Sequence, residues 1–156
     1  MSRRDQIKLS EAERDELLES ERIVVVSSNG IRGWPHSMPM WFVVRDDDEI
    51  WVWTYAKSQK VRNLERDPRA TLLVEAGTEY TELRGIQIEA EAELVRDPDR
   101  VAEFGAELTV RYAEGIDSVE GDAAAALRAQ AAKRVAIRFE PIRVATWDHR
   151  KLGGTY

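Results

Sequence analysis

The stretch TYAKSQKVRNLERDPRA, residues 54–70, concentrates positive charge. It holds five basic residues against two acidic ones, although the chain of 156 residues has a formal net charge of −6. Local charge that opposes the overall balance usually has a local partner, either an internal carboxylate or an anionic ligand. The stretch follows a strand-like run at residues 49–55, and Val61 and Leu64 begin a short helix within it. Asp67 ends that helix, because Pro68 disfavours the α conformation of the residue before it.

A strand-to-helix junction of this kind suits a phosphate group. The first turn of a helix presents unpaired backbone N–H groups and the positive end of the helix dipole. Ser58 can donate its hydroxyl, and Lys57 and Lys60 can reach the same oxygens as ammonium donors. The alternative is a solvated amphipathic helix in which Arg62 only pairs with Glu65.

Composition restricts the classes of protein to which the chain can belong. At 43% hydrophobic residues, residues 1–156 predict a single domain with its own core. A sequence pI near 5.1 argues against a nucleic-acid partner. The sequence has no cysteine, and therefore no disulfide, thiol nucleophile or cysteine-bound metal. The first ten residues lack an apolar leader, and no run of about 18 apolar residues predicts a membrane span, so a cytoplasmic location is expected.

The pattern of apolar residues predicts a mainly β domain. Ser10 and Glu13 form a capping-box sequence for a helix that runs to about Ser20. Short polar turns join the first strand-like runs, which indicates an antiparallel meander in an α+β barrel of about six strands. Gly85 predicts a bulge or bend in one long strand. The expected strands are residues 23–27, 36–45, 49–55, 70–75, 82–95, 135–139 and 143–147. Pro141 separates the last two.

The pattern SxKxxNLxRDPRA at residues 58–70 resembles the hallmark segment of the pyridoxamine-phosphate-oxidase-like split β-barrels. Within that superfamily it is most similar to the branch that binds the deazaflavin coenzyme F420. The segment PHSMPMW at residues 35–41 also fits, and the similarity covers residues 23–95 and the last strands. The resemblance implies an α+β, mainly β fold: a six-stranded antiparallel split β-barrel with peripheral helices. It also implies a homodimer with cofactor sites at the subunit interface.

The resemblance also implies cofactor-binding residues. Lys60, expected to be exposed, matches the basic residue that holds the cofactor phosphate. Ser58 matches a phosphate-contacting position that is often arginine in relatives, and Lys57 could supply the charge that serine lacks. Asn63 is placed near the phosphate end. The residues expected beside the tricyclic ring are Trp53, Thr54 and Tyr55 on one strand, and Ser37, Met38 and Pro39 on the neighbouring strand.

The implied activity is hydride transfer from reduced F420 to a small, largely apolar acceptor. The sequence contains no obligatory nucleophile or acid–base dyad, so no catalytic residue is assigned. FMN is the alternative cofactor, and Arg62, Arg66 and Arg69 could instead favour the longer acidic tail of F420. A non-catalytic cofactor-binding protein is the third possibility. Residues 147–154 do not match the ending of true pyridoxamine phosphate oxidases, so synthesis of pyridoxal phosphate is not expected.

The histidines and tryptophans leave further alternatives open. His36 and His149 are the only histidines and lack metal-ligand spacing, so no metal site is expected. His149 and the preceding Asp148 could form an orienting pair or belong to a surface tail. The five tryptophans, among them Trp51, are expected in the core, at a dimer interface or against a flavin. Dimerisation is expected through strand faces and the C-terminal segment.

Overall fold

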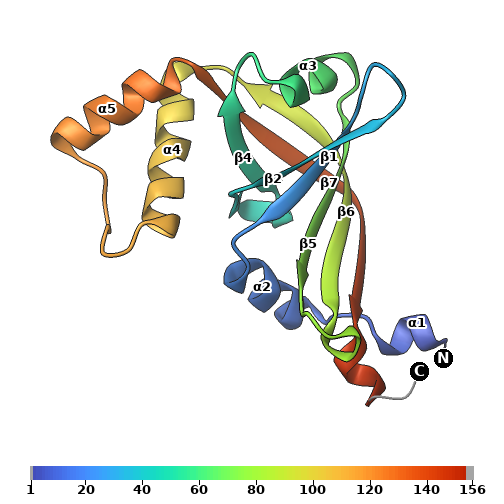
Figure 1. The fold of residues 1–156 in the computed structure, drawn as a ribbon. Helices are drawn as coiled ribbons and strands as arrows, with labels where there is room; N and C mark the ends of the chain where they lie inside the picture. The colour runs from blue at the N-terminus through green and yellow to red at the C-terminus, as the bar shows by residue number, and fades with distance from the viewer. Residues whose placement is uncertain (1, 154–156) are drawn as a thin grey trace.

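The computed structural model describes residues 2–153 and contains one curled antiparallel sheet of seven strands (Figure 1). The strand order across the sheet is β2-β1-β5-β6-β7-β4-β3. The two outermost strands, β2 and β3, are separated in the chain only by Trp41 and Phe42, so the sheet curls until its two edges come together there. The strands are β1 (Val24–Asn29), β2 (Pro35–Met40), β3 (Val43–Val44), β4 (Ile50–Tyr55), β5 (Arg69–Ala76), β6 (Arg84–Val95) and β7 (Arg134–Asp148).

The sheet has seven strands where about six were expected: the expected strand at residues 36–45 is two strands, and the expected strands at 135–139 and 143–147 are one. Phe42 lies at the break with its side chain fully buried. Its N–H donates to the Tyr112 hydroxyl at 3.0 Å, and that hydroxyl lies 2.9 Å from the Phe42 carbonyl oxygen. Because a side chain satisfies these backbone groups, the chain leaves one strand partner, β1, and takes another, β4.

The C-terminal strand was predicted in two pieces and is continuous. Pro141 lies inside β7, where a register shift pairs Glu89 with Arg143 and Ala90 with Pro141. A proline is tolerated at such a bulge, because the ladder is already interrupted there. Gly85, predicted to mark a bulge, instead allows a close approach: a Cβ there would lie 2.4 Å from the Trp147 ring.

Two apolar cores hold the helices against the sheet. The larger lies inside the curled sheet, and α2 covers one end of it with Leu17 and Leu18. The predicted capping box of α2 is present. The smaller core lies between the outer face of the sheet and α4, where Trp51 packs on Phe104. The helices are α1 (Arg3–Gln6), α2 (Glu11–Ser20), α3 (Gln59–Arg66), α4 (Pro98–Tyr112) and α5 (Gly121–Ala131), with short 3-10 turns at Asp46–Asp48, Tyr80–Glu82 and His149–Leu152.

The helix α3 lies at the end of the sheet where β4 finishes, as the opening stretch predicted (Figure 1). Val61 and Leu64 anchor it in the larger core. The Asp67 N–H donates to the Asn63 carbonyl, and the helix ends at Arg66, before Pro68. Within residues 2–153, no helix has the length and apolar character needed to cross a membrane.

Candidate functional site

The junction of β4 and α3 brings together two hydroxyl groups and one ammonium group. Thr54 and Lys60 are both buried, with 7% and 6% of their surfaces exposed. The Lys60 ammonium donates to the Thr54 hydroxyl at 3.2 Å. The Ser58 hydroxyl lies 3.5 Å from the Thr54 hydroxyl. Three of the predicted site residues therefore form one polar cluster, which we call the junction cluster.

The position of Lys60 corrects the expectation that this side chain is exposed. Burial lowers its pKa from 10.5, because the ammonium has lost much of its hydration. Within residues 2–153, no carboxylate lies close enough to form an ion pair with it. A buried cation with a single hydroxyl partner is unfavourable by itself and would be relieved by an anion.

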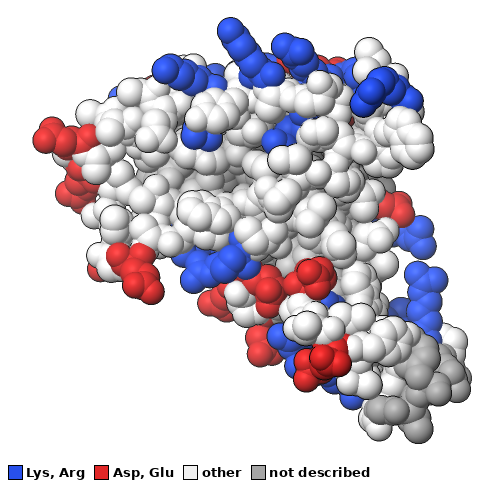
Figure 2. All heavy atoms as spheres, in the orientation of Figure 1, with Lys and Arg blue, Asp and Glu red and all other residues white. Residues whose placement is uncertain are grey.

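Ser58 and Lys57 complete the entrance to this cluster. Ser58 is the residue before the first turn of α3, but its hydroxyl makes no capping bond to the helix. Its hydroxyl and the first-turn N–H groups of α3 can therefore serve a ligand. Lys57 is exposed. Figure 2 shows lysine and arginine side chains gathered at the top of the molecule, over α3, and most acidic ones farther down.

The predicted ring-contacting residues of β4 do not share one face. Thr54 points to the junction cluster, whereas Trp53 and Tyr55 alternate to the opposite face, as strand geometry requires. There the Arg134 guanidinium lies 4.4 Å from the Trp53 ring centroid and 4.3 Å from that of Tyr55. Gly105 of α4 approaches the same indole so closely that a Cβ would lie 2.7 Å from it.

The predicted residues of β2 lie on a strand that does not neighbour β4 in the sheet. Ser37, Met38 and Pro39 pair with residues of β1, so the expectation of a neighbouring strand was wrong. The chain changes partners at the break after Met40, which the sequence pattern did not reveal. All three predicted residues are exposed, Met38 by 41%. The Ser37 hydroxyl is bonded to the Ser27 hydroxyl at 2.8 Å.

Asn63 is fully buried and fastens α3 to the sheet. Its side-chain amide donates to the Ser28 hydroxyl at 3.1 Å and accepts from the Gln59 amide at 2.9 Å. Both ends of the amide are thus used within the protein. These bonds give Asn63, which was expected near the phosphate end, a role in holding α3 to β1.

The three arginines of the opening stretch differ in their partners. Arg69 forms an ion pair with Asp67 at 2.7 Å, and this guanidinium holds the pKa of Asp67 well below its usual range. Arg66 donates to the Asn29 carbonyl oxygen. Glu65 pairs with Arg96, not with Arg62. Among residues 2–153, Arg62 makes no ion pair and is exposed, so it remains available to an anionic ligand.

Asp148 and His149, the possible orienting pair at the end of β7, each have another partner. Asp148 is buried, and the Arg150 guanidinium pairs with it at 2.7 Å and lowers its pKa. The His149 Nδ1 atom instead lies 2.8 Å from the Tyr80 carbonyl oxygen. Asp148 therefore has a structural role in its ion pair with Arg150.

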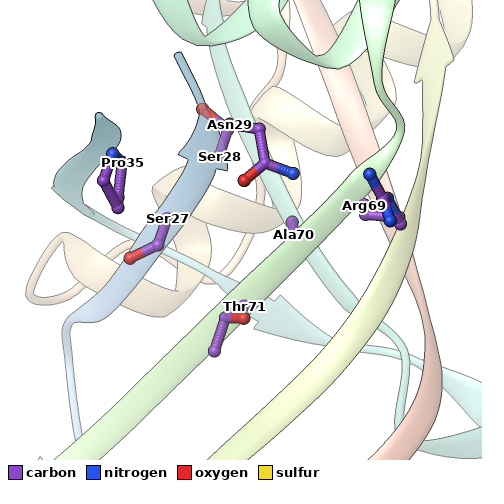
Figure 3. A pocket seen from close by; sticks show the side chains of 7 residues that line it. All are labelled: Ser27, Ser28, Asn29, Pro35, Arg69, Ala70 and Thr71. Carbon is purple, nitrogen blue, oxygen red and sulfur yellow. The ribbon is translucent and has the colours of Figure 1, made fainter. Parts of the chain in front are cut away.

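Two surface pockets lie near the β1–β2 hairpin. The first, about 330 Å³ in volume, lies across the ends of three strands (Figure 3). Its lining consists of Ser27, Ser28, Asn29, Pro35, Arg69, Ala70 and Thr71. The second, about 320 Å³, lies between the hairpin and α3, and we call it the hairpin pocket. Neither pocket is lined by the junction cluster, and the sequence predicted neither of them.

Comparisons with known proteins identify the family and the fold of the chain. The family model described as pyridoxamine 5'-phosphate oxidase matches residues 10–148. The conserved hypothetical protein Rv2991 of Mycobacterium tuberculosis is 37% identical, with a TM-score of 0.87, and the match covers 100% of this chain and 95% of that one.

Two more distant structures share the fold. An F420 reductase is 23% identical with a TM-score of 0.66, over 88% of this chain and 98% of its own. A FAD-binding protein of Mesorhizobium loti is 15% identical with a TM-score of 0.62, over 89% and 94%. The comparison with curated proteins gives no match. The chain belongs to the pyridoxamine 5'-phosphate oxidase family of split β-barrels.

Proposed function

We propose that this protein binds the deazaflavin coenzyme F420 and transfers a hydride from its reduced form to a small, largely apolar acceptor. The junction cluster carries the proposal, because its buried Lys60 ammonium has one hydroxyl partner at 3.2 Å and no ion pair within residues 2–153. A phosphate group would supply the missing negative charge. Family membership and the fold shared with an F420 reductase support this cofactor class.

The residues present fit the phosphate end of such a cofactor. The Lys60 ammonium and the Ser58 hydroxyl can donate to phosphate oxygens, together with the first-turn N–H groups of α3. When bound, a reduced deazaflavin supplies a hydride from the central carbon of its ring. The task of this chain is then to fix the phosphate and to leave the reactive side of the ring open to the acceptor.

FMN is the alternative cofactor, and electrostatics can separate the two. FMN ends in a phosphate monoester, whereas F420 carries a phosphodiester and an acidic oligoglutamate tail. Arg62 and Arg66 are both exposed and make no ion pair within the described chain, but Arg66 already donates to the Asn29 carbonyl oxygen, so we propose that Arg62 contacts the tail. Arg69 is its matched control, because Asp67 already neutralises it.

We also propose that the protein is a homodimer. The edge strand β2 pairs only with β1, and four of its six residues are exposed. An exposed edge with apolar residues such as Met38 is typically covered by a partner. Trp51 packs under α4 at 5% exposure, so a substitution there would test folding and not the interface. Met38→Glu is the appropriate variant, and a monomeric mass for the wild-type protein at micromolar concentration would refute the dimer.

Titration of the purified protein with each cofactor tests the proposal. Absorbance spectra should show binding, because flavin and deazaflavin bands differ. Isothermal titration at low and high salt should show F420 affinity falling more steeply than FMN affinity. Arg62→Glu should lower the affinity for F420 and leave the affinity for FMN unchanged. Arg69→Glu should change neither affinity. Tighter FMN binding under both conditions would favour FMN, and a bound cofactor that is never reoxidised by any acceptor would favour the non-catalytic alternative.

A further inference from the structure

The arginines that stack on aromatic rings differ in how their guanidinium groups are used. Within residues 2–153, four arginines lie over rings: Arg22, Arg45, Arg111 and Arg134. The first and the third also donate to backbone carbonyl oxygens, and Arg45 pairs with Glu107. The Arg134 guanidinium makes no hydrogen bond and no ion pair in the part of the chain that the structure describes. Its charge therefore has aromatic neighbours but no counter-ion there.

The Arg134 side chain lies against two rings on the outer face of the sheet. Its guanidinium is 4.4 Å from the Trp53 ring centroid and 4.3 Å from that of Tyr55. These contacts hold a long side chain in place, so it loses less freedom when it binds a ligand. The Nε atom is buried, but Arg134 as a whole is partly exposed and Tyr55 is 58% exposed. The terminal nitrogens of the guanidinium are thus open to a ligand beside the Tyr55 ring.

The surroundings of Arg134 favour an anion. The Lys133 carbonyl oxygen accepts from the Ala56 N–H at 3.0 Å, which brings the turn that carries Lys57 beside the start of β7. Both lysines are exposed, and neither forms an ion pair within residues 2–153. This corner belongs to the basic top of the molecule (Figure 2). Three neighbouring cations without a carboxylate partner raise the local concentration of anions.

The same corner adjoins the junction cluster across β4. Arg134 is the register partner of Tyr55, the residue that follows Thr54. The interior side of the junction is closed, because Val61 is fully buried in the larger core there. A ligand whose phosphate contacts Lys60 therefore continues over the surface at the end of β4, one strand away from Arg134.

We propose that Arg134 binds the hydride acceptor, and that this acceptor is a largely apolar molecule with one carboxylate group. The guanidinium pairs with the carboxylate, and the exposed Tyr55 ring packs on the apolar part. Arg134 positions the acceptor and takes no part in the transfer itself. The inference rests on the proposed function and narrows its class of acceptor.

Isothermal titration with 3-phenylpropanoate and its neutral analogue 3-phenylpropanamide tests the pairing. The protein is titrated both without cofactor and saturated with oxidised F420. The carboxylate should bind roughly tenfold more tightly than the amide, because only the carboxylate forms a charge-assisted pair. Its affinity should fall with added salt, whereas that of the amide should not. This salt comparison uses the wild-type protein and needs no variant to fold.

Matched variants assign the contact to one residue. Arg134→Gln should lower the affinity for 3-phenylpropanoate about tenfold, to that of the amide, and leave the amide unchanged. Lys133→Gln removes a charge one residue earlier and should change either affinity by less than about twofold.

The contrary outcomes separate this inference from the proposed function. Equal affinity for the two probes, a preference that survives Arg134→Gln, or no binding at millimolar 3-phenylpropanoate would overturn it. A tenfold loss of F420 affinity in Arg134→Gln would make Arg134 a cofactor contact and would also overturn it. If neither F420 nor FMN binds while Arg134 still distinguishes the probes, the proposed function is refuted and Arg134 is confirmed as a carboxylate site.

Discussion

Replacing Lys60 with methionine should make the protein more stable and its cofactor binding weaker. Methionine keeps much of the length of lysine but removes the ammonium. Lys60 is only 6% exposed, and the Thr54 hydroxyl is the hydrogen-bond partner of its ammonium. Without a bound anion, the folded protein therefore carries a poorly compensated charge.

The expected magnitudes follow from this environment. Replacing buried ionic groups with hydrophobic residues of similar volume often stabilises by about 1–4 kcal/mol. Because the Thr54 hydroxyl still solvates Lys60, we expect the lower end, about 1 kcal/mol, or roughly 2–4 °C in Tm. Loss of a charge-assisted bond to phosphate should cost about 1.5–3 kcal/mol, which weakens cofactor binding roughly ten- to a hundredfold.

The pH dependence gives an independent readout of the same cause. Burial lowers the pKa of Lys60 from 10.5, so at pH values below the lowered pKa the folded wild-type protein bears the full cost of the charge. As the pH rises from the lowered pKa towards 10.5, the folded state releases the proton and unfolding takes it up again. Wild-type stability should therefore rise across this window, and the advantage of Lys60→Met should shrink.

Urea unfolding without cofactor and isothermal titration with it measure the two effects. Lys57→Met is the matched control, because it makes the same chemical change three residues earlier at an exposed position. It should alter stability by less than about 0.5 kcal/mol. A folded Lys60→Met protein with unchanged cofactor affinity would refute the assignment of Lys60 as phosphate anchor. Lower stability of that variant would refute the account of a poorly compensated charge.

Three further substitutions test the architecture around the site. Gly105→Ala should destabilise by about 1–3 kcal/mol, because its Cβ would press on the Trp53 ring, and thermal unfolding should show it. Asn63→Ala should lower the free energy of unfolding in urea by about 1–3 kcal/mol, because it leaves buried polar partners unsatisfied. At low temperature, where the variant remains folded, it should retain most of its cofactor affinity. Asp148→Asn should lose stability at pH 7, because Arg150 lowers the pKa of Asp148 below 3.8. The difference from wild type should fade as the pH drops below 3.8, since the stabilisation is lost when the folded carboxylate is protonated.

The sequence predicted the local features of the site well. The end of β4, the start of α3 and the stop before Pro68 depend on neighbouring residues, and all three were found where the pattern placed them. The contact between Thr54 and Lys60 also lies within one strand-to-helix turn. Such features are accessible from sequence because turn chemistry and helix signals are short-range.

The features that the sequence did not predict depend on contacts between distant segments. The break at Phe42 depends on Tyr112, 70 residues away, and this break assigns β2 to β1 instead of β4. Periodicity shows that two faces of a strand differ, but not which face meets the cofactor. Thr54 and Tyr55 thus fell on opposite faces despite being predicted together.

The burial of Lys60 depends both on short-range sequence features and on contacts between distant segments. Its position in the sequence predicted a phosphate contact, but the amphipathic pattern gave no reason to expect a lysine with 6% of its surface exposed. Val61 and Leu64, which follow Lys60 in α3, are anchored in the larger core, and their packing holds Lys60 inward with the helix. A solvated lysine would hold a phosphate weakly, because water competes for the ammonium. The same packing that lowers the stability of the cofactor-free protein therefore strengthens the interaction available to an anion, since the charge has already lost much of its hydration before the ligand arrives.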